Sequence, residues 1–321
     1  MTQLLPDRIL QTGFGFWSAR VLLSAIELDV FTELARGPRT RAQLQRSLQL
    51  DAHAAGDFLD ALVSLRLLER EGDDDAAVYV NSREAGQFLD ARNPADLGRW
   101  MREGHAVLAA TWDQLSSVLR SDAVSNGAQR TVWRDDWLGP WARLFGDTLA
   151  QRLPWAQAQT LLDVQGGSGE LVCALAAAQP QLQAWTLQPA ARLEAAAAHI
   201  AQHGLAACVR ALPLHAPWPR ADVVVLNRWS PACELPLSDE LALAREALNP
   251  GGRVLLIDHL LDDARRHDAA ALMAILSRRM AGETMTTRTA RAAQALCAAA
   301  GFARSECLPL LGGASVVQAF V

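Results

Sequence analysis

The sequence contains no lysine, a single tyrosine and only five cysteines among its 321 residues. Without lysine, the chain offers no residue for a Schiff base, a lysine general base or the phosphate contact of a P-loop. The cysteines form no CxxC pair, so we expect reduced structural thiols and no metal site or disulfide framework. They are Cys173, Cys208, Cys233, Cys297 and Cys307.

Long apolar runs and an excess of basic charge are also absent. No apolar run approaches the roughly 20 residues that span a bilayer, and the start of the sequence lacks the basic flank and cleavage site of a secretory signal. The formal charge is −5, whereas nucleic-acid binding needs a concentrated basic face. Half of the residues are hydrophobic, which excludes a disordered chain. We therefore predict a cytoplasmic protein with no membrane and no nucleic-acid partner.

Residues 1–95 have the pattern of a small helical domain. Apolar residues recur at helical spacing over 9–34, and two further helices are predicted over 41–48 and 52–68. A charged turn between two short extended segments follows at 69–82. Two helices and a hairpin are typical of a winged helix. Acidic residues outnumber basic ones on its second helix, which favours a dimerisation module over DNA binding.

Residues 96–155 read as a helical segment between two domains and carry much of the tryptophan. Large aromatic side chains are core residues by default. A dense group between domains is equally the wall of a pocket for a flat aromatic ligand, and the sequence leaves both interpretations open. The tryptophans concerned are Trp100, Trp112, Trp133, Trp137, Trp141 and Trp155.

Residues 156–321 alternate between strands and helices. Four short apolar runs, at 160–164, 183–187, 221–227 and 253–258, are separated by helix-like stretches, and two more strands close the sequence. This alternation predicts an α/β domain, with a doubly wound, mostly parallel sheet and helices on both faces. Its ligand is expected beyond the carboxyl ends of the strands. The first such end is followed by glycines, which let the backbone approach a ligand, and by a helix N-terminus.

Several stretches together resemble one family, the small-molecule O-methyltransferases of the acetylserotonin and hydroxyindole type, which use S-adenosylmethionine (SAM). The resemblance implies a winged-helix dimerisation domain followed by a Rossmann-like class I methyltransferase domain. It also implies a homodimer, or a heterodimer with a related methyltransferase, formed through the N-terminal domain. The matching stretches are ILQTGFGFWSARVLLSAIELDVFTELA (9–35), FLDALVSLRLLEREGD (58–73), LLDVQGGSGE (161–170), AREALNPGGRVLLID (244–258) and AAAGF (298–302).

The resemblance implies a cofactor site that this chain retains only in part. The family loop Asp-x-Gly-Gly-Gly-[Ser/Thr]-Gly matches Asp163, Gly167 and Gly169, but its first glycine is replaced by Gln165. The acidic residue that holds the ribose hydroxyls in the family falls on Gln188. A neutral amide keeps only part of the roughly 1.5–3 kcal/mol that a charged acceptor contributes per hydrogen bond. After the third strand, Pro213 and Leu214 stand where the family has Gly-Asp. We read these cofactor residues as vestigial.

The catalytic histidine implied by the family is missing. Its position falls near Pro231 and that of the following aspartate near Ala232, and the loss of a positioned base costs about 10²–10⁴-fold in rate. Asp258 and Glu283 match acids that support the base in the family. His105 and His259 are the candidates for a replacement base, although an ordinary structural histidine is the favoured interpretation of both.

The sequence therefore predicts a methyltransferase-like protein of secondary-metabolite biosynthesis that is not an ordinary methyltransferase and has no cofactor. In one version it is a non-catalytic partner subunit of an active methyltransferase, a pseudoenzyme. In the other it is a repurposed SAM-independent enzyme that acts on an aromatic or polycyclic intermediate by orientation and local acids. The alternative is a divergent but active SAM-dependent O-methyltransferase acting on a phenolic small molecule, since positioning supplies much of the acceleration.

Overall fold

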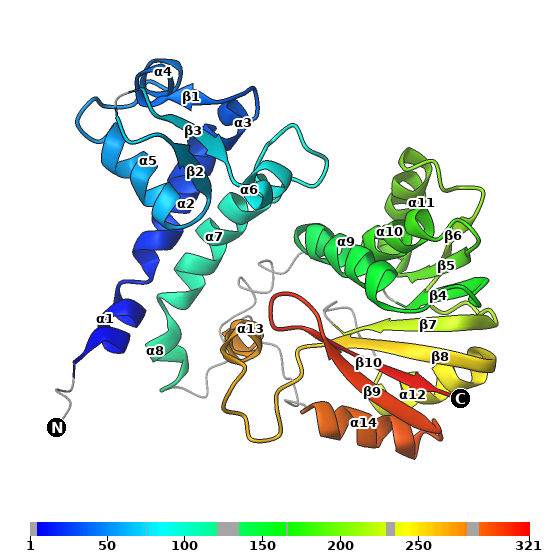
Figure 1. The fold of residues 1–321 in the computed structure, drawn as a ribbon. Coiled ribbons are helices and arrows are strands. Elements are labelled where there is room, and N and C mark those ends of the chain that lie inside the picture. Colours follow the sequence, from blue (N-terminus) through cyan, green and yellow to red (C-terminus); the bar gives the residue numbers. More distant parts are fainter. Residues whose placement is uncertain (1–4, 75, 121–134, 165, 229–234, 281–288) are drawn as a thin grey trace. The chain divides into compact units, whose positions relative to one another are not determined.

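Helices dominate the first unit of the computed structural model, and a seven-stranded sheet dominates the second (Figure 1). The two units comprise Met1–Ala109 and Ala110–Val321, so the division falls inside the predicted helical segment 96–155. The structure describes residues 5–74, 76–120, 135–164, 166–228, 235–280 and 289–321, with the side chains of 135–138 also outside the description.

The first unit contains the predicted winged helix. Helices α4 and α5 precede the antiparallel hairpin β2–β3, and β1 adds a third strand in the order β1-β3-β2. The predicted order of two helices and a hairpin is therefore confirmed. The elements are α1 (Asp7–Gly13), α2 (Phe16–Glu27), α3 (Val30–Leu34), β1 (Arg39–Thr40), α4 (Arg41–Ser47), α5 (Ala55–Ser64), β2 (Leu68–Glu71), β3 (Val78–Asn81), α6 (Arg83–Phe88) and α7 (Gly98–Trp112), which crosses the division.

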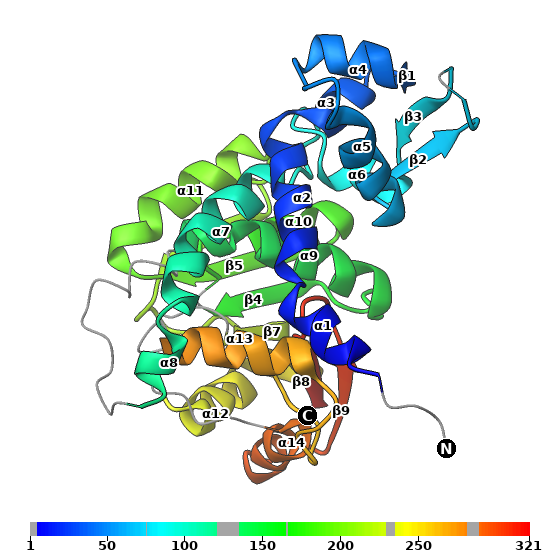
Figure 2. The ribbon, with the colours of Figure 1, turned by 90° about the vertical axis from the view of Figure 1, so that its left-hand side faces the viewer.

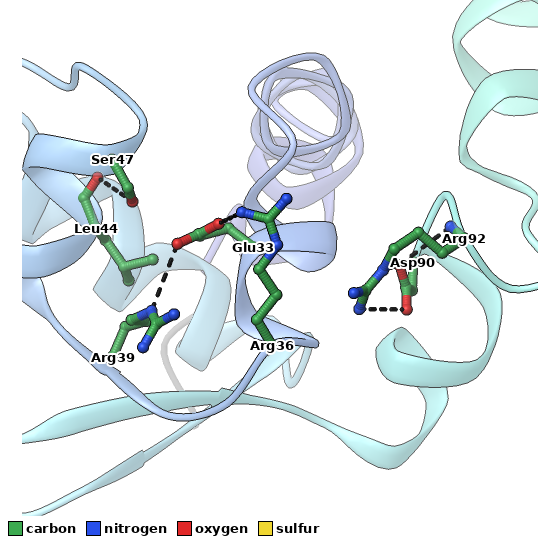
Figure 3. Close-up of polar contacts among 7 residues, drawn as sticks. All are labelled: Glu33, Arg36, Arg39, Leu44, Ser47, Asp90 and Arg92. Atoms are coloured by element: carbon green, nitrogen blue, oxygen red, sulfur yellow. Dashed lines mark hydrogen bonds and ion pairs between the residues drawn. The ribbon is translucent and has the colours of Figure 1, made fainter.

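Local capping and ion pairs hold this small unit together around a buried core that includes Phe31 and Leu62. Thr40 begins α4 with a capping box, because its side chain accepts from the Gln43 backbone while the Gln43 side chain accepts from Thr40 N. Such a cap stabilises a helix by about 1 kcal/mol. Glu33 contacts Arg36 at 2.7 Å and Arg39 at 3.4 Å, which links α3 to the segment that follows it and to the first residue of β1 (Figure 3).

Helix α1 and the start of α2 project from the rest of the first unit (Figures 1 and 2). Their apolar side chains are exposed. Ile9 and Phe16 are 75% and 60% exposed, and Trp17, 57% exposed, stacks on Phe14. The stretch Asp7–Glu27 is long and apolar enough to cross a membrane by length and composition, although only 6% of it is buried. A search of the sequence for an unbroken apolar run does not find this stretch, because Gln11, Ser18 and Arg20 interrupt its apolar residues; only its average hydropathy reaches that of a membrane-crossing helix.

The second unit has the order of a doubly wound sheet. The strands lie in the order β6-β5-β4-β7-β8-β10-β9. The five from β6 to β8 are parallel, whereas β10 is antiparallel to β8 and β9. The elements are α8 (Leu115–Val118), α9 (Asp135–Arg152), β4 (Thr160–Val164), α10 (Glu170–Ala178), β5 (Gln183–Gln188), η2 (Ala190–Arg192), α11 (Leu193–Gln202), β6 (Val209–Pro213), β7 (Ala221–Asn227), α12 (Leu237–Ala247), β8 (Leu248–Asp258), α13 (Ala269–Met280), α14 (Ala290–Ala299), β9 (Arg304–Pro309) and β10 (Ser315–Phe320).

Successive residues of the central parallel strands pack into two separate hydrophobic cores, one on each face of the sheet, because side chains alternate between the faces. On β4, Leu161 packs with α9, α10 and α11, whereas Leu162 packs with α12 and α14. Figure 1 shows these two groups of helices on opposite sides of the sheet. The predicted α/β fold class is thus confirmed, and both faces of the parallel strands are covered.

Helices α9 and α10 approach each other so closely that the contact requires glycine. A Cβ atom at Gly146 would lie 2.7 Å from the Cβ of Ala174 and 2.9 Å from the carbonyl oxygen of Leu171. Two of the tryptophans flank this pair as core residues: Trp155 is buried and donates to the Leu149 carbonyl over 2.9 Å, and Trp141 packs near Phe145. For these two side chains the structure favours the core interpretation over the pocket wall.

Candidate functional site

Three buried polar side chains form a hydrogen-bonded chain at the carboxyl ends of β4 and β5. Thr186 Oγ1 donates to Asp163 Oδ2 over 3.2 Å and accepts from Gln188 Nε2 over 2.8 Å. All three residues are fully buried. The sheet itself places them together, because Asp163 is the register partner of Thr186, and residues two apart on β5 share a face.

Burial controls the charge of Asp163. The loss of water raises the pKa of its carboxyl group from 3.8 to about 7, and the hydrogen bond from Thr186 lowers it only in part. A neutral hydroxyl offsets the desolvation of a carboxylate far less than a cation would. Asp163 therefore titrates near neutral pH.

The glycine loop closes directly over this carboxyl group. A Cβ atom at Gly166 would lie 1.7 Å from Asp163 Oδ2, so the loop fits over Asp163 only with glycine there. Gly167 and Gly169 have φ angles of +62° and +88°, the left-handed region that glycine adopts freely. Gly169 is the N-cap of α10. The structure thus brings Asp163, Gly167, Gly169 and Gln188 to one end of the sheet, while Gln165 lies outside the described residues.

Two acceptors beside this loop lack a hydrogen-bond partner within the described part of the chain. They are Asp163 Oδ1 and Gln188 Oε1, and both are buried. A buried acceptor without a donor costs about 1–3 kcal/mol. A ligand with hydroxyl or ammonium donors would satisfy both atoms, and SAM carries two ribose hydroxyls and an ammonium group. The residues present therefore fit that cofactor.

Asp258, the predicted supporting acid, is held by an arginine. It is buried at the end of β8, its Oδ1 accepts from the His259 backbone over 2.8 Å, and Arg278 Nη1 of α13 lies 3.6 Å away. The neighbouring His259 is 4% exposed. Burial, aided by the Arg278 charge, lowers the pKa of His259 to about 3, so its ring is neutral at physiological pH and a weak base.

Of the remaining predicted residues, Pro213 and Leu214 lie beside Gln188, and the others belong to the first unit or fall outside the described residues. His105 lies half-buried on α7 in the first unit. Glu283 lies outside the described residues, as do Pro231 and Ala232, which stand at the positions of the family histidine and aspartate. Pro213 ends β6, and the backbone of the following Leu214 donates to the Gln188 carbonyl over 2.7 Å.

Sequence reasoning missed two partners of the site. Thr186 was visible in the alternation of β5, which puts it on the same face as Gln188. Arg278 had no signal in the sequence, because it reaches Asp258 from a separate helix. The four cysteines that the structure describes are free, as expected. Burial raises the pKa of the Cys173 thiol to about 12, which keeps this thiol protonated and unreactive.

The strand order, the glycine loop and the covering helices define a class I methyltransferase fold. Two family models match the chain: the O-methyltransferase dimerisation domain over residues 10–91 and the O-methyltransferase domain over residues 127–303. The chain therefore belongs to the O-methyltransferase family with an N-terminal dimerisation domain.

Named relatives agree with this family. The chain is 32% identical to the tetracenomycin polyketide synthesis 8-O-methyl transferase TcmO of Streptomyces glaucescens, over 85% of this chain and 84% of that protein. It is 29% identical to the N,N-dimethyltransferase OxyT of Streptomyces rimosus, over 80% and 79%. Human N-acetylserotonin methyltransferase, solved in complex with SAM, shares the fold with a TM-score of 0.76 and 20% identity, over 99% of this chain and 98% of that one. The expectation that no cofactor binds finds no support in these relatives.

Proposed function

We propose that this chain is a SAM-dependent O-methyltransferase of small-molecule biosynthesis whose hold on the donor is weakened. The observation that carries the proposal is the pair of buried acceptors without donors among the described residues, Asp163 Oδ1 and Gln188 Oε1, beside the glycine loop. The names of TcmO and of a mitomycin biosynthesis 6-O-methyltransferase, 26% identical over 78% of this chain, support an oxygen of a biosynthetic intermediate as the acceptor.

The residues of this chain divide the work of holding the donor. The loop 166–169 and the start of α10 would receive its amino-acid end, since helix N-termini favour a carboxylate. Gln188 Oε1 would accept from a ribose hydroxyl and Asp163 Oδ1 from the ammonium group, while Asp163 Oδ2 lies against Gly166 of the loop. When bound, the donor supplies an electrophilic methyl group.

Proton removal in this site proceeds without the family histidine, because no histidine lies between His215 and His259 in the sequence. Positioning therefore carries most of the acceleration. A phenol suits such a site, because its hydroxyl is acidic enough to lose its proton without a strong base. An aromatic or polycyclic phenol is thus the proposed substrate class.

Calorimetry with SAM and S-adenosylhomocysteine tests the donor site. We expect saturable binding, with a dissociation constant of roughly 10–500 µM, equivalent to about −7 to −4.5 kcal/mol. Gln188→Leu should weaken this binding at least tenfold. Gln183→Leu is the matched control, because Gln183 begins the same strand but is exposed, and it should bind as the wild type does. The proposal is overturned if wild-type protein binds neither compound at about 1 mM.

A second candidate is favoured by the direction of the Gln188 amide. Its NH₂ group donates to Thr186 inside the protein, and the residue is fully buried. This arrangement is expected of a chain whose ancestral nucleoside site no longer binds a nucleoside. The protein would then be either a non-catalytic partner subunit of an active methyltransferase or a repurposed SAM-independent enzyme on an aromatic intermediate. Absent SAM binding together with co-purification of a related methyltransferase selects the subunit. A self-dimer that binds an aromatic metabolite selects the enzyme.

Helices α1 and α2 are the proposed centre of a dimer interface in a cytoplasmic protein. They expose Phe16 and Trp17 within the region matched by the dimerisation family, and exposed apolar patches of this kind mark interaction sites. We assign residues 1–95 to dimerisation, 96–155 to the segment between domains and 156–321 to the methyltransferase domain. The double variant Phe16→Glu/Trp17→Glu should sediment as a monomer. Leu119→Glu, on a residue that is 68% exposed in the second unit, should remain dimeric.

A further inference from the structure

One carboxylate and two imidazoles meet between α10 and α11. Glu170 is the first residue of α10, and His199 and His203 lie four residues apart on α11 and at its C-cap, a spacing that puts both rings on one face of the helix. One ligand atom from each of the three residues lies within 4.8 Å of the others. The two rings have their centroids 4.2 Å apart.

The distance between the Glu170 carboxylate and the His199 ring nitrogen matches that between two ligands of one metal ion. Glu170 Oε2 lies 3.3 Å from His199 Nε2. Ligands about 2.1 Å from a tetrahedral zinc ion are themselves about 3.4 Å apart. His199 Nε2 is buried and makes no hydrogen bond of acceptable geometry to any described residue, Glu170 included. A cation between the two atoms would satisfy both.

His203 has the ring state that metal binding requires. Its Nδ1 lies 3.0 Å from the carbonyl oxygen of His199. Because a carbonyl only accepts, this nitrogen carries the proton, and the lone pair of the neutral ring is on Nε2. A backbone carbonyl that fixes the tautomer in this way is the usual outer partner of a metal-binding histidine.

Close packing also restricts the carboxylate. The Glu170 side chain passes next to Gly139 of α9, where an added Cβ would lie 3.3 Å from Glu170 Cγ. Its side chain is 22% exposed and that of His199 is 17% exposed, so the group is sheltered yet open to solvent. This preorganisation lowers the entropy lost when an ion binds.

We propose that Glu170, His199 and His203 bind one zinc-class dication per chain, with a water molecule in the fourth position. Two imidazoles and one carboxylate suit Zn²⁺, Co²⁺ or Ni²⁺, whereas Mg²⁺ and Ca²⁺ prefer oxygen ligands throughout. The ion ties the first turn of α10 to α11. Because Glu170 directly follows Gly169, the ion also holds the end of the glycine loop. The expectation of no metal site was based on the cysteines and did not consider the His-x₃-His spacing of His199 and His203.

The metal-free, full-length chain titrated with Zn²⁺ by calorimetry, and with Co²⁺ by visible absorption, tests the site. We expect one ion per chain with a dissociation constant of about 10 µM or tighter, and the intense visible bands of four-coordinate Co²⁺. His203→Ala and Glu170→Gln should each weaken binding at least tenfold. His267→Ala is the control, because its side chain is 81% exposed, and it should bind as the wild type does.

Two results would overturn the proposal. One is the absence of saturable Zn²⁺ binding at about 100 µM. The other is binding that His199→Ala and His203→Ala leave unchanged while both variants keep the wild-type circular dichroism spectrum. A variant that loses this spectrum is replaced by His203→Gln, which keeps a polar side chain of similar length. The titration is carried out without SAM, so its outcome does not depend on whether the chain transfers a methyl group.

Discussion

Asp163 and Asp258 occupy equivalent places in the sheet but have different electrical surroundings. Each lies at the carboxyl end of a parallel strand, β4 or β8, and each is at most 1% exposed. Asp163 receives a hydrogen bond from a neutral hydroxyl, whereas Asp258 lies 3.6 Å from the Arg278 guanidinium. A buried carboxylate keeps its charge when a cation accompanies it, and otherwise its pKa rises. The comparison separates a buried acid that has a cation beside it from one whose side-chain hydrogen bond comes from a neutral hydroxyl.

The largest expected effect is a pH dependence of stability caused by Asp163. Its pKa is about 7 in the folded chain, against 3.8 for a solvent-exposed aspartate such as the unfolded chain presents. The folded state therefore binds more protons between these values, and stability falls as pH rises from about 4 to 7, by roughly 4 kcal/mol. Asp163→Asn should remove this fall in the free energy of unfolding, as measured by urea denaturation across the same pH range.

Asp222 provides the control of opposite sign. Burial acts to raise its pKa, but hydrogen bonds from Asn249, Gln159 and Thr160 outweigh burial, so the net pKa is lowered. Its contribution to stability is lost as pH falls through the lowered folded-state pKa. If Asp163→Asn leaves the pH profile between about 4 and 7 unchanged, the raised pKa of Asp163 is wrong, and with it the contrast between Asp163 and Asp258.

Removal of the cation from the second acid should have the next largest effect. Arg278→Met leaves a buried carboxylate without its arginine and should destabilise the chain by about 3 kcal/mol, the low end for such pairs because 3.6 Å exceeds hydrogen-bond length. The double variant Arg278→Met/Asp258→Asn should recover much of this loss. Arg279→Met, on the exposed neighbouring residue, should change the free energy of unfolding little. Equal effects of the two single variants would contradict the ion pair.

The Thr186 hydroxyl, which lies between Asp163 and Gln188, should contribute less to the free energy of unfolding than the Arg278 side chain does. Thr186→Val removes the donor to Asp163 and the acceptor of Gln188 together, which should cost about 1–3 kcal/mol. The pKa of Asp163 should rise further, as measured by NMR titration of its carboxyl carbon. Thr186→Ser, which keeps the hydroxyl, should leave that pKa close to its wild-type value, and a shift as large as that of Thr186→Val would argue against the hydrogen bond.

The smallest effect is expected from the Gln188 end of this hydrogen-bonded chain. Gln188→Leu removes both the amide donor to Thr186 and a buried oxygen that has no donor among the described residues. The lost hydrogen bond and the relief of the unsatisfied oxygen offset each other, so the free energy of unfolding should change by less than about 1 kcal/mol. Because Gln188→Leu should remain folded, a loss of SAM binding by this variant in calorimetry would reflect the binding site and not unfolding. A loss of several kcal/mol in chemical denaturation would contradict this balance between the lost hydrogen bond and the relieved oxygen.

Much of the sheet was predictable because apolar runs bounded by glycine, proline and polar residues mark parallel strands. The predicted runs 160–164 and 221–227 coincide with β4 and β7. The run at 253–258 is only the inner part of β8, which begins at Leu248, before the Pro-Gly-Gly turn. No local pattern announces that β10 lies between β8 and β9, because strand order depends on contacts far apart in sequence.

The site was predictable where backbone geometry decides it and not where distant side chains do. The glycines at 166, 167 and 169 marked the loop because only glycine meets its steric demands. The state of Asp258 depends on Arg278, twenty residues further along and on a separate helix, and that contact has no periodic signature. The charge of Asp163 likewise follows from its depth in the protein, which is a property of the whole unit.

The close contact at Gly146 couples the positions of α9 and α10. Only the Ala174 methyl group lies between the two backbones there, and such close packing transmits a displacement from one helix to the other. We therefore expect a displacement of the first turn of α10 to move α9 with it. Trp155, which donates to the Leu149 carbonyl of α9, should report such a displacement as a change in its fluorescence.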